Sequence, residues 1–209
     1  CGWVIVLVDY GGGNLRSVAK ALEVVVPPTG GRFIVSSRPE DVAAAEVLVL
    51  PGQGAAPDIM RSLRCLGLVE PLKEGIATKP YLGICIGLQM LLDTSEEGDT
   101  SCLGVIPGNV RRLPEGLKVP HMGWNQVRQV QQHPVFAAIP DNANFYFVHS
   151  YYADPVDKTW VAGETEYGVA LCSAIARGNM VATQFHPEKS GRWGITFLQN
   201  FLRFAKEGG

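Results

Sequence analysis

The stretch Tyr-Leu-Gly-Ile-Cys-Ile-Gly-Leu-Gln, residues 81–89, decides how this chain is expected to fold. Its first four residues form a short apolar run typical of a buried strand, and a helical pattern follows at once over Ile86–Leu92. Cys85 stands at the junction, with a glycine two residues before it and another two residues after it. Small neighbours permit the sharp strand-to-helix turn that displays a nucleophile, and the helix N-terminus favours a thiolate. A buried core cysteine is the simpler alternative.

The first hundred residues repeat the same strand–helix alternation. Three further apolar runs read as strands, and each is followed by a helical pattern. The expected strands are Val4–Val8, Phe33–Val35 and Val47–Leu50, and the expected helices are 14–24, a short one from Pro39, and Ile59–Leu72. Such alternation predicts βαβ units and a parallel sheet flanked by helices.

After about residue 100 the pattern changes to closely spaced strands separated by Pro, Gly and Asn turns, which favours antiparallel additions to the sheet. These strands are expected at Val105–Leu113, Trp124–Val130, Phe145–Ala153, Trp160–Tyr167, Val169–Ala176 and Met180–Gln184, with a closing helix at Gly194–Lys206. We see no linker or internal repeat and predict one α/β domain over residues 1–209, with a mixed, mostly parallel sheet.

Composition excludes several classes of protein. The 209 residues include 18 Lys and Arg against 20 Asp and Glu, and 46% are hydrophobic, so intrinsic disorder and binding to nucleic acid or membranes mainly through charge are not expected. The longest apolar runs are strand-sized, far below the ~20 residues of a membrane span. We therefore expect no nucleic-acid and no membrane partner.

The five cysteines point to a reducing compartment. They are odd in number, widely spaced and without a Cys-x-x-Cys pair, which argues against a disulfide framework and a zinc site. No basic-then-apolar leader pattern opens the sequence. We predict a cytoplasmic protein with no metal and no cofactor.

Two more segments at expected strand ends carry candidate chemistry. In Pro51-Gly52-Gln53-Gly54, two glycines let backbone N–H groups turn toward an oxyanion. In Gln184-Phe185-His186-Pro187-Glu188, a His could serve a thiol as base while the Glu orients it. Taken singly, each segment is also compatible with a plain turn.

Other polar clusters are read more simply. His121, His133 and His149 are scattered and lack metal-ligand spacing. Glu40-Asp41 and Glu96-Glu97-Gly98-Asp99 are interpreted as solvated loops.

Together, in this order, the Pro51–Gly54, Gly83–Gln89 and Phe185–Glu188 motifs resemble the class I (triad-type) glutamine amidotransferases, over nearly the whole chain from Val4 to Phe204. Within that family, Val-Pro-His-Met-Gly-Trp-Asn at 119–125 and Tyr-Phe-Val-His-Ser-Tyr-Tyr at 146–152 are similar to the glutaminase subunits of imidazole glycerol phosphate synthases, in histidine biosynthesis. The opening Asp9-Tyr10-Gly11, followed by residues 14–18, is similar to the first turn and helix of these subunits. Gln53 and the Gly-Gly-Gly before Asn14 depart from the pattern.

The resemblance implies a flavodoxin-like fold and a glutaminase that works through a γ-glutamyl thioester on Cys85. His186 would be the base and Glu188 would orient it. The oxyanion would be held by backbone groups of Ile86, Gln53 and Gly54. The α-groups of L-glutamine would be fixed by Gln89, Ser150 and Tyr151.

The resemblance also implies a partner, a separate (β/α)₈ cyclase subunit that receives the ammonia and makes imidazole glycerol phosphate and an aminoimidazole carboxamide ribotide. The residues expected to face this subunit are Asn14, Met122, Trp124, Tyr146 and Lys189. We expect the Pro51–Gly54 turn to rearrange when the subunit binds, because glycines make a peptide flip sterically cheap. Trp124 and Tyr146 could instead be ordinary core aromatics.

Three alternatives remain open on sequence alone. Cys1-Gly2 followed by an apolar strand is how N-terminal-nucleophile amidotransferases begin. Another class I glutaminase, such as the one serving pyridoxal phosphate synthesis, shares the motifs, but the sequence of residues 120–125 argues against this alternative. A non-catalytic relative could retain the elbow without productive geometry.

Overall fold

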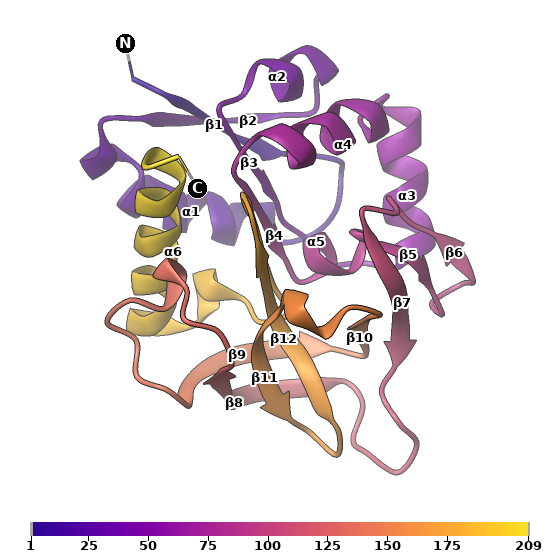
Figure 1. Cartoon of the computed structure of the whole chain (residues 1–209). Coiled ribbons are helices and arrows are strands. Elements are labelled where there is room, and N and C mark those ends of the chain that lie inside the picture. Colours follow the sequence, from indigo (N-terminus) through magenta and orange to yellow (C-terminus); the bar gives the residue numbers. More distant parts are fainter. Residues whose placement is uncertain (1, 209) are drawn as a thin grey trace.

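A computed structural model describes residues 2–208, and its centre is a nine-stranded mixed sheet (Figure 1). Five adjacent strands run parallel, in the order β2 (Arg32–Ser36), β1 (Val4–Val8), β3 (Val47–Leu50), β4 (Tyr81–Ile84) and β13 (Met180–Thr183). Four antiparallel strands extend the sheet, namely β12 (Ala170–Arg177), β11 (Val161–Glu166), β8 (His121–Gln129) and β9 (Ala143–His149). The predicted α/β class and the antiparallel additions are therefore confirmed.

A second sheet, which the sequence pattern does not predict, lies beside the first. Its four strands are β10 (Tyr151–Pro155), β7 (Ile106–Arg112), β5 (Leu92–Ser95) and β6 (Thr100–Ser101). The expected single strand Phe145–Ala153 is wrong, because β9 and β10 are separated at Ser150 and belong to different sheets.

Helices cover both faces of the large sheet, as Figure 1 shows. One face carries α1 (Leu15–Val25) and α6 (Gly191–Lys206); the other carries α2 (Pro39–Ala44), α3 (Ala56–Cys65), α4 (Val69–Thr78) and the short α5 (Ile86–Gln89). Single 3₁₀ turns lie at η1 (Pro27–Thr29), η2 (Pro134–Phe136), η3 (Lys158–Trp160) and η4 (Pro187–Lys189).

Alternate residues of the central strands enter two separate cores. In β1, Ile5 and Leu7 pack with the α1 and α6 side, whereas Val6 and Val8 pack with the α3 and α4 side. All four are at most 1% exposed, which explains why the strand reads as a continuous apolar run with no alternation. The strand ends are thus held rigidly between two packed layers.

Two expected helices end earlier than the apolar pattern suggests. The single helix expected over Ile59–Leu72 is two helices, α3 and α4, because Gly67 between them adopts a left-handed φ of 70°. The helix expected over Ile86–Leu92 ends at Gln89, and Leu92 begins β5. Apolar residues that continue into a second buried element cannot be told from helix by periodicity alone.

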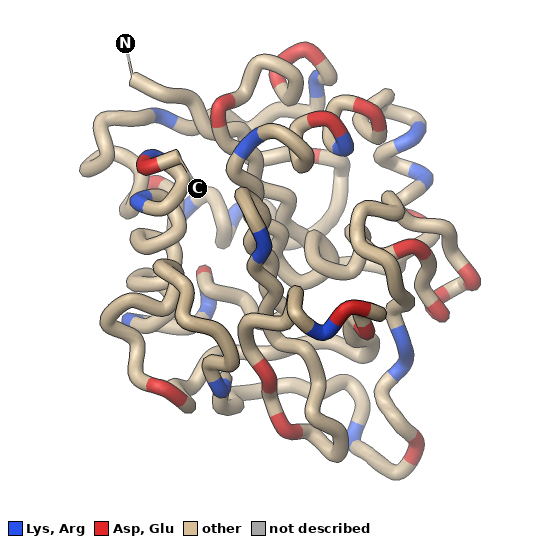
Figure 2. The backbone as a smooth tube through the Cα atoms, in the orientation of Figure 1, with Lys and Arg blue, Asp and Glu red and all other residues tan. Residues whose placement is uncertain are grey.

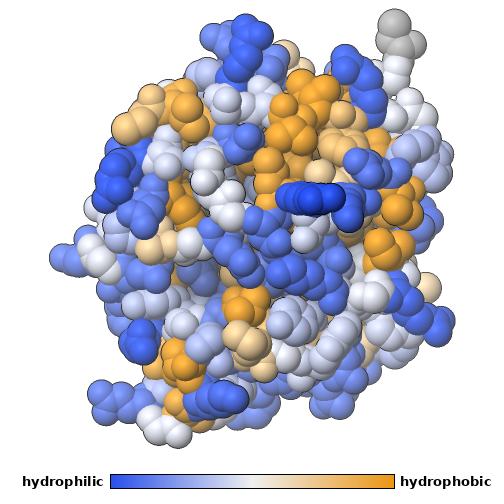
Figure 3. Space-filling view, turned by 180° about the vertical axis from the view of Figure 1, so that it is seen from behind, coloured by the Kyte–Doolittle hydropathy of each residue, from blue (hydrophilic) through white to orange (hydrophobic). Residues whose placement is uncertain are grey.

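Charges of both signs are spread over the molecule, in line with the near-neutral composition (Figure 2). In the part of the chain that the structure describes, none of the helices has the length and apolar content needed to cross a membrane. On the face seen from behind, hydrophobic residues form small groups among hydrophilic ones (Figure 3). The large apolar side chains exposed within residues 2–208 are Val24, Val35, Leu66, Met122, Trp124 and Val156.

Candidate active site

Three neighbouring parallel strands bring the sequence motifs together. The strands β3, β4 and β13 pair side by side, and their carboxyl ends lead into Pro51–Gly54, Cys85 and 184–188 respectively. The carboxyl edge of a parallel sheet is where ligand sites form in such folds. The three motifs therefore share one site, as the sequence analysis predicts.

Cys85 occupies a strained turn between β4 and α5. Its φ of 53° and ψ of −98° lie outside the regions that non-glycine residues ordinarily adopt. A Cβ on Gly83 would lie 2.3 Å from the carbonyl oxygen of Gly87, and one on Gly87 would lie 2.2 Å from that of Leu50. Both glycines are thus required by close backbone approach, which is the geometry of a nucleophile elbow.

His186 and Glu188 form a buried pair behind the cysteine. The imidazole Nδ1 lies 3.1 Å and 3.3 Å from the two carboxylate oxygens of Glu188, and the side chains are 1% and 0% exposed. The His186 Nε2 has no hydrogen-bond partner among the described residues, and the Cys85 side chain lies close enough to influence the pKa of His186. Burial alone would lower the pKa of His186, but the negative charges of Cys85 and Glu188 outweigh it and raise the pKa above its ordinary value.

This charge arrangement favours the protonated form of the His186 imidazole. The carboxylate holds Nδ1 as the protonated nitrogen, which leaves Nε2 as the base. Nucleophile–base hydrogen bonds are often looser in a free enzyme than in its substrate complex. Cys85 and His186 are therefore the candidate nucleophile and base of this site.

A glutamine that the sequence reasoning left without a role also touches the sulfur. The Gln184 Nε2 donates to the Cys85 Sγ over 3.4 Å, and the Gln184 Oε1 accepts from Gln89 Nε2 at 3.1 Å. The Gln89 Nε2 also donates to the Tyr151 carbonyl at 3.0 Å. Gln184 is fully buried, and its place directly before Phe185-His186 was the only sequence feature that could have pointed to it.

The Pro51–Gly54 turn is anchored by the N-terminal loop. The Tyr10 hydroxyl donates to the Pro51 carbonyl at 2.6 Å, and the Gly13 N–H donates to the Gln53 carbonyl at 3.3 Å. Gly52 and Gly54 have φ values of 140° and 143°, which glycine adopts without a steric penalty. Burial, with smaller contributions from Cys85 and Asp9, raises the pKa of Tyr10, so this phenol stays a protonated donor.

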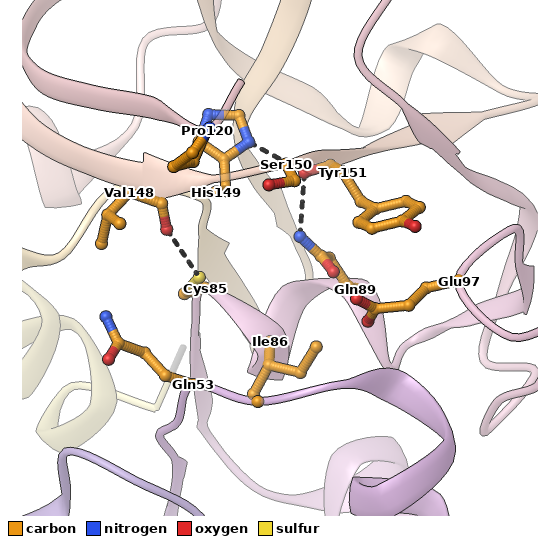
Figure 4. A pocket seen from close by; sticks show the side chains of 11 residues that line it. Gln53, Cys85, Ile86, Gln89, Glu97, Pro120, Val148, His149, Ser150 and Tyr151 are labelled. Carbon is orange, nitrogen blue, oxygen red and sulfur yellow. Dashed lines mark hydrogen bonds between the residues drawn. The ribbon is translucent and has the colours of Figure 1, made fainter. Parts of the chain in front are cut away.

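A cavity of about 240 Å³ opens at Cys85 (Figure 4). Its lining residues are Gln53, Gly54, Cys85, Ile86, Gln89, Glu97, Pro120, Val148, His149, Ser150 and Tyr151. All the residues predicted for the oxyanion and for glutamine therefore meet at one cavity, while His186 and Glu188 lie outside its lining.

Glu97 corrects one sequence interpretation. The acidic loop at 96–99 was expected to be solvated, yet Glu97 lines the cavity, and its Oε1 accepts from the N–H of Ala56 at 2.6 Å. A carboxylate here could bind a cationic group of a ligand. No sequence pattern indicates this role, because Glu97 lies in a run of acidic residues without a distinguishing feature.

The predicted partner-facing residues lie on neighbouring elements. Met122 and Trp124 project from one face of β8 and are 61% and 58% exposed, so the alternative that Trp124 is a core aromatic is wrong. Tyr146 on β9 is half-buried and meets Trp124 edge to face, with ring centroids 5.9 Å apart. Lys189 lies in η4, which contacts β9 and also α1, where Asn14 is the N-terminal flanking residue.

Cys65, Cys102 and Cys172 do not line this cavity. Cys65, Cys85, Cys102 and Cys172 are free thiols, and Cys1, the nucleophile of one sequence alternative, lies outside the described residues. Within 2–208, no group of three or more His, Cys, Asp or Glu side chains is placed to hold a metal ion.

Comparison with known proteins places these features in a family. Residues 6–204 match the family "Glutamine amidotransferase class-I". The imidazole glycerol phosphate synthase subunit HisH of Dehalococcoides mccartyi is 51% identical over 204 residues, covering 97% of this chain and 98% of that protein. The subunit of the same name from Aromatoleum aromaticum is 53% identical over 210 residues, covering 96% and 98%.

Solved structures show the same fold at low identity. A crystal structure of a glutamine amidotransferase aligns with a TM-score of 0.73 at 18% identity, covering 96% of this chain and 98% of that one. A glutamine amidotransferase from Thermotoga maritima aligns with a TM-score of 0.62 at 19% identity, covering 99% and 85%.

Proposed function

The chain belongs to the class I glutamine amidotransferases, and from this premise we propose that it is the glutaminase subunit of an imidazole glycerol phosphate synthase. The single observation that carries the proposal is the strained Cys85 at the mouth of a cavity, backed by the buried His186–Glu188 pair. The chain is 51% and 53% identical to two subunits of such synthases over nearly its full length, which supports this function over that of other class I glutaminases.

The proposed reaction hydrolyses the side-chain amide of L-glutamine. His186 Nε2 takes the Cys85 proton, and the thiolate attacks the γ-carboxamide carbon. The imidazolium then returns the proton to the departing nitrogen, which leaves as ammonia while a γ-glutamyl thioester forms. A water molecule, deprotonated by His186, attacks the thioester and releases glutamate and the free thiol. Glu188 remains ionised throughout and keeps the imidazole in the correct tautomer.

Backbone N–H groups around the sulfur would stabilise the oxyanion. Ile86 is the first residue of α5, where a helical N–H has no partner within its own helix, and it lines the cavity beside Cys85. The Gln53–Gly54 turn approaches from β3 and also lines the cavity. Because these donors are backbone groups, Gln53 preserves the role despite its unusual side chain.

The other cavity residues would select glutamine over simple amides. Glu97 supplies a carboxylate for the α-ammonium group, a role that the sequence did not predict. Gln89, Ser150 and Tyr151 line the same wall and would fix the remaining α-groups. A cavity of about 240 Å³ suits one amino acid.

The ammonia would pass to the (β/α)₈ cyclase subunit, because in bulk water at neutral pH it would be protonated and would lose its nucleophilicity. We propose that this subunit docks on the patch formed by Asn14, Met122, Trp124, Tyr146 and Lys189. Exposed Met and Trp side chains are enriched at the cores of protein interfaces. Docking would rearrange the Pro51–Gly54 turn, now held by Tyr10 and Gly13, and so activate the site.

The remaining alternatives are distinguishable. Membership of class I removes the N-terminal-nucleophile alternative, whose fold differs. A glutaminase subunit serving pyridoxal phosphate synthesis would be activated by a different synthase, and a non-catalytic relative would not release glutamate at all.

Glutamate release, measured at rising concentrations of the cyclase subunit with and without its nucleotide substrate, tests the proposal. We expect a nearly silent isolated chain, activation by the cyclase, and no release by Cys85→Ala. Release that persists in Cys85→Ala would refute the function. Full activity of the isolated chain would refute only the activation by the partner.

A further inference from the structure

Two buried histidines outside the proposed Cys-His-Glu triad lie in contact with each other: His149, which lines the cavity, and His121 behind it. His121 on β8 and His149 on β9 face each other directly in the antiparallel register, and they are 4% and 6% exposed. The His121 Nδ1 and the His149 Nε2 are 2.8 Å apart. At the far ends, His149 Nδ1 lies 2.8 Å from the Tyr151 carbonyl oxygen, and His121 Nε2 lies 3.2 Å from Asn125 Nδ2.

The hydrogen bonds of a neutral pair can run in only one direction. A carbonyl oxygen only accepts, so His149 Nδ1 must carry a proton, and its Nε2 is then an acceptor. His121 Nδ1 must therefore be the donor between the rings. The His121 Nε2 in turn accepts from the Asn125 amide, which also donates to the Glu166 carbonyl at 3.1 Å. Both rings are thus assigned the Nδ1-protonated tautomer.

The surroundings of the pair favour the neutral state. His121 is stacked between Phe147 and Tyr167, with ring centroids 4.8 Å and 4.0 Å away. Burial lowers the pKa of His121 to about 4 and that of His149 to about 3. His186 acts on His149 in the same direction through its positive charge, and none of the described hydrogen-bond partners of either ring is a carboxylate.

The chain of donors ends on an atom that matters to the site. The Tyr151 carbonyl accepts from His149 on one side and from Gln89 Nε2, at 3.0 Å, on the other. The Gln89 amide is thereby fixed in orientation, and through Gln184 it is linked to the Cys85 sulfur. Figure 4 shows His149 and Gln89 approaching the Ser150–Tyr151 backbone from opposite sides.

We propose that His121 and His149 are positioning residues for the glutamine site, acting as a directional relay of neutral rings that holds the Tyr151 carbonyl and, through it, the Gln89 side chain. The proposal rests on the glutaminase function proposed above. Neither ring transfers a proton in the reaction; their role is to set the geometry of the wall formed by 148–151.

Two matched substitutions separate the two nitrogens of His149. In His149→Asn the amide nitrogen replaces Nδ1 and can still donate to Tyr151, whereas in His149→Gln the amide lies at the level of Nε2 and that donor is lost. Since one hydrogen bond contributes roughly a factor of 2 to 13, we expect His149→Gln to raise the glutamine KM by about threefold to tenfold, with kcat changed less than twofold. His149→Asn should restore most of the wild-type KM. Steady-state glutaminase kinetics of the complex with the cyclase subunit give these values.

His133→Gln is the control, because His133 is a half-buried histidine that caps η2 and packs near Phe204, away from the cavity. It should leave KM unchanged. Equal KM values in His149→Gln and His149→Asn would overturn the positioning role.

Nitrogen-15 NMR of the histidine rings in the full chain tests the relay without any turnover. We expect His121 and His149 to be neutral and protonated on Nδ1 near neutral pH, which is the minor tautomer of free histidine. An Nε2-protonated or charged ring at either position would overturn the proposal. If the wild-type complex releases no glutamate, the proposed function fails and the positioning role falls with it, but the tautomers remain readable. Correct tautomers with equal KM values in the two variants would refute this inference alone.

Discussion

The strained backbone at Cys85 predicts that the Cys85→Gly variant is more stable than the Cys85→Ala variant. With φ at 53° and ψ at −98°, a residue that carries a Cβ is held in a sparsely populated conformation, at a cost of about 1–3 kcal/mol. Cys85→Gly removes this cost, whereas Cys85→Ala retains it. Both variants lose the thiol, so both should lack glutaminase activity.

The expected difference follows from two opposing terms. At an ordinary position glycine destabilises a protein by about 0.5–1 kcal/mol relative to alanine, because it loses more backbone entropy on folding. Relief of about 1–3 kcal/mol of strain outweighs that term at residue 85. We therefore expect Cys85→Gly to be more stable than Cys85→Ala by about 1 kcal/mol, which for a domain of this size corresponds to a Tm difference of roughly 2–4 °C.

Urea unfolding and thermal melts of the two variants measure the difference. Ala19→Gly is the control, since Ala19 lies inside α1 and its replacement should cost about 1 kcal/mol in the ordinary direction. If Cys85→Ala proves as stable as Cys85→Gly while the control behaves as expected, the strain argument is refuted.

Three further predictions concern the base, the buried histidines and the patch. His186→Ala should lower kcat by roughly three or more orders of magnitude and Glu188→Gln by less, since an imidazole without its carboxylate keeps some productive orientation; equal rates for His186→Ala and wild type would contradict this. Burial holds the pKa of His149 at about 3 in the folded protein, whereas an unfolded histidine has a pKa of about 6.5. Between these values the unfolded state binds one more proton, so the free energy of unfolding should fall with falling pH by up to about 1.4 kcal/mol per pH unit for this residue. In urea unfolding between pH 6.5 and 4, the His149→Asn variant should lack this contribution to the pH dependence of the free energy of unfolding. An unchanged pH dependence would contradict the neutral, buried state of His149. In the glutamate-release assay, the Trp124→Ala, Lys189→Ala double variant should lose most of its activation by the cyclase subunit, whereas Val156→Ala, at another exposed position, should keep it. Undiminished activation of the double variant would show that the patch is not the docking surface.

Local patterns predicted the elements that are buried on both sides. The runs Val4–Val8, Val47–Leu50 and Tyr81–Ile84 are strands with the expected bounds, because each forms the middle of a parallel sheet and has no polar face to confuse the pattern. The second sheet was missed for the opposite reason. Its strand β7 matches the expected strand Val105–Leu113, but β5 and β6 are short. Leu92 continues an apolar run that begins in α5, so that only tertiary pairing with β7 defines β5.

The site residues likewise fall into two groups: those that the predicted strand ends bring together, and those whose positions depend on tertiary structure. Cys85, His186 and the Pro51–Gly54 turn follow strands in the sequence, and parallel pairing brings such ends together. Glu97 reaches the cavity from a loop whose path depends on the unpredicted second sheet. The His121–His149 contact depends on the register of β8 with β9, which the residues on either strand do not reveal alone.

The central claim, that Cys85 is the nucleophile and His186 its base, is tested most directly by a glutamine-analogue electrophile followed by peptide mass spectrometry on the complex. The wild type should be labelled at Cys85 and His186→Ala should not. Burial raises the pKa of Cys102 to about 11 and that of Cys172 to about 12, so both should be spared, and exposed Cys65 should be spared because no neighbouring base selects it. Labelling at Cys1 or Cys65 in place of Cys85, or labelling of Cys85 at the same rate without His186, would contradict the account.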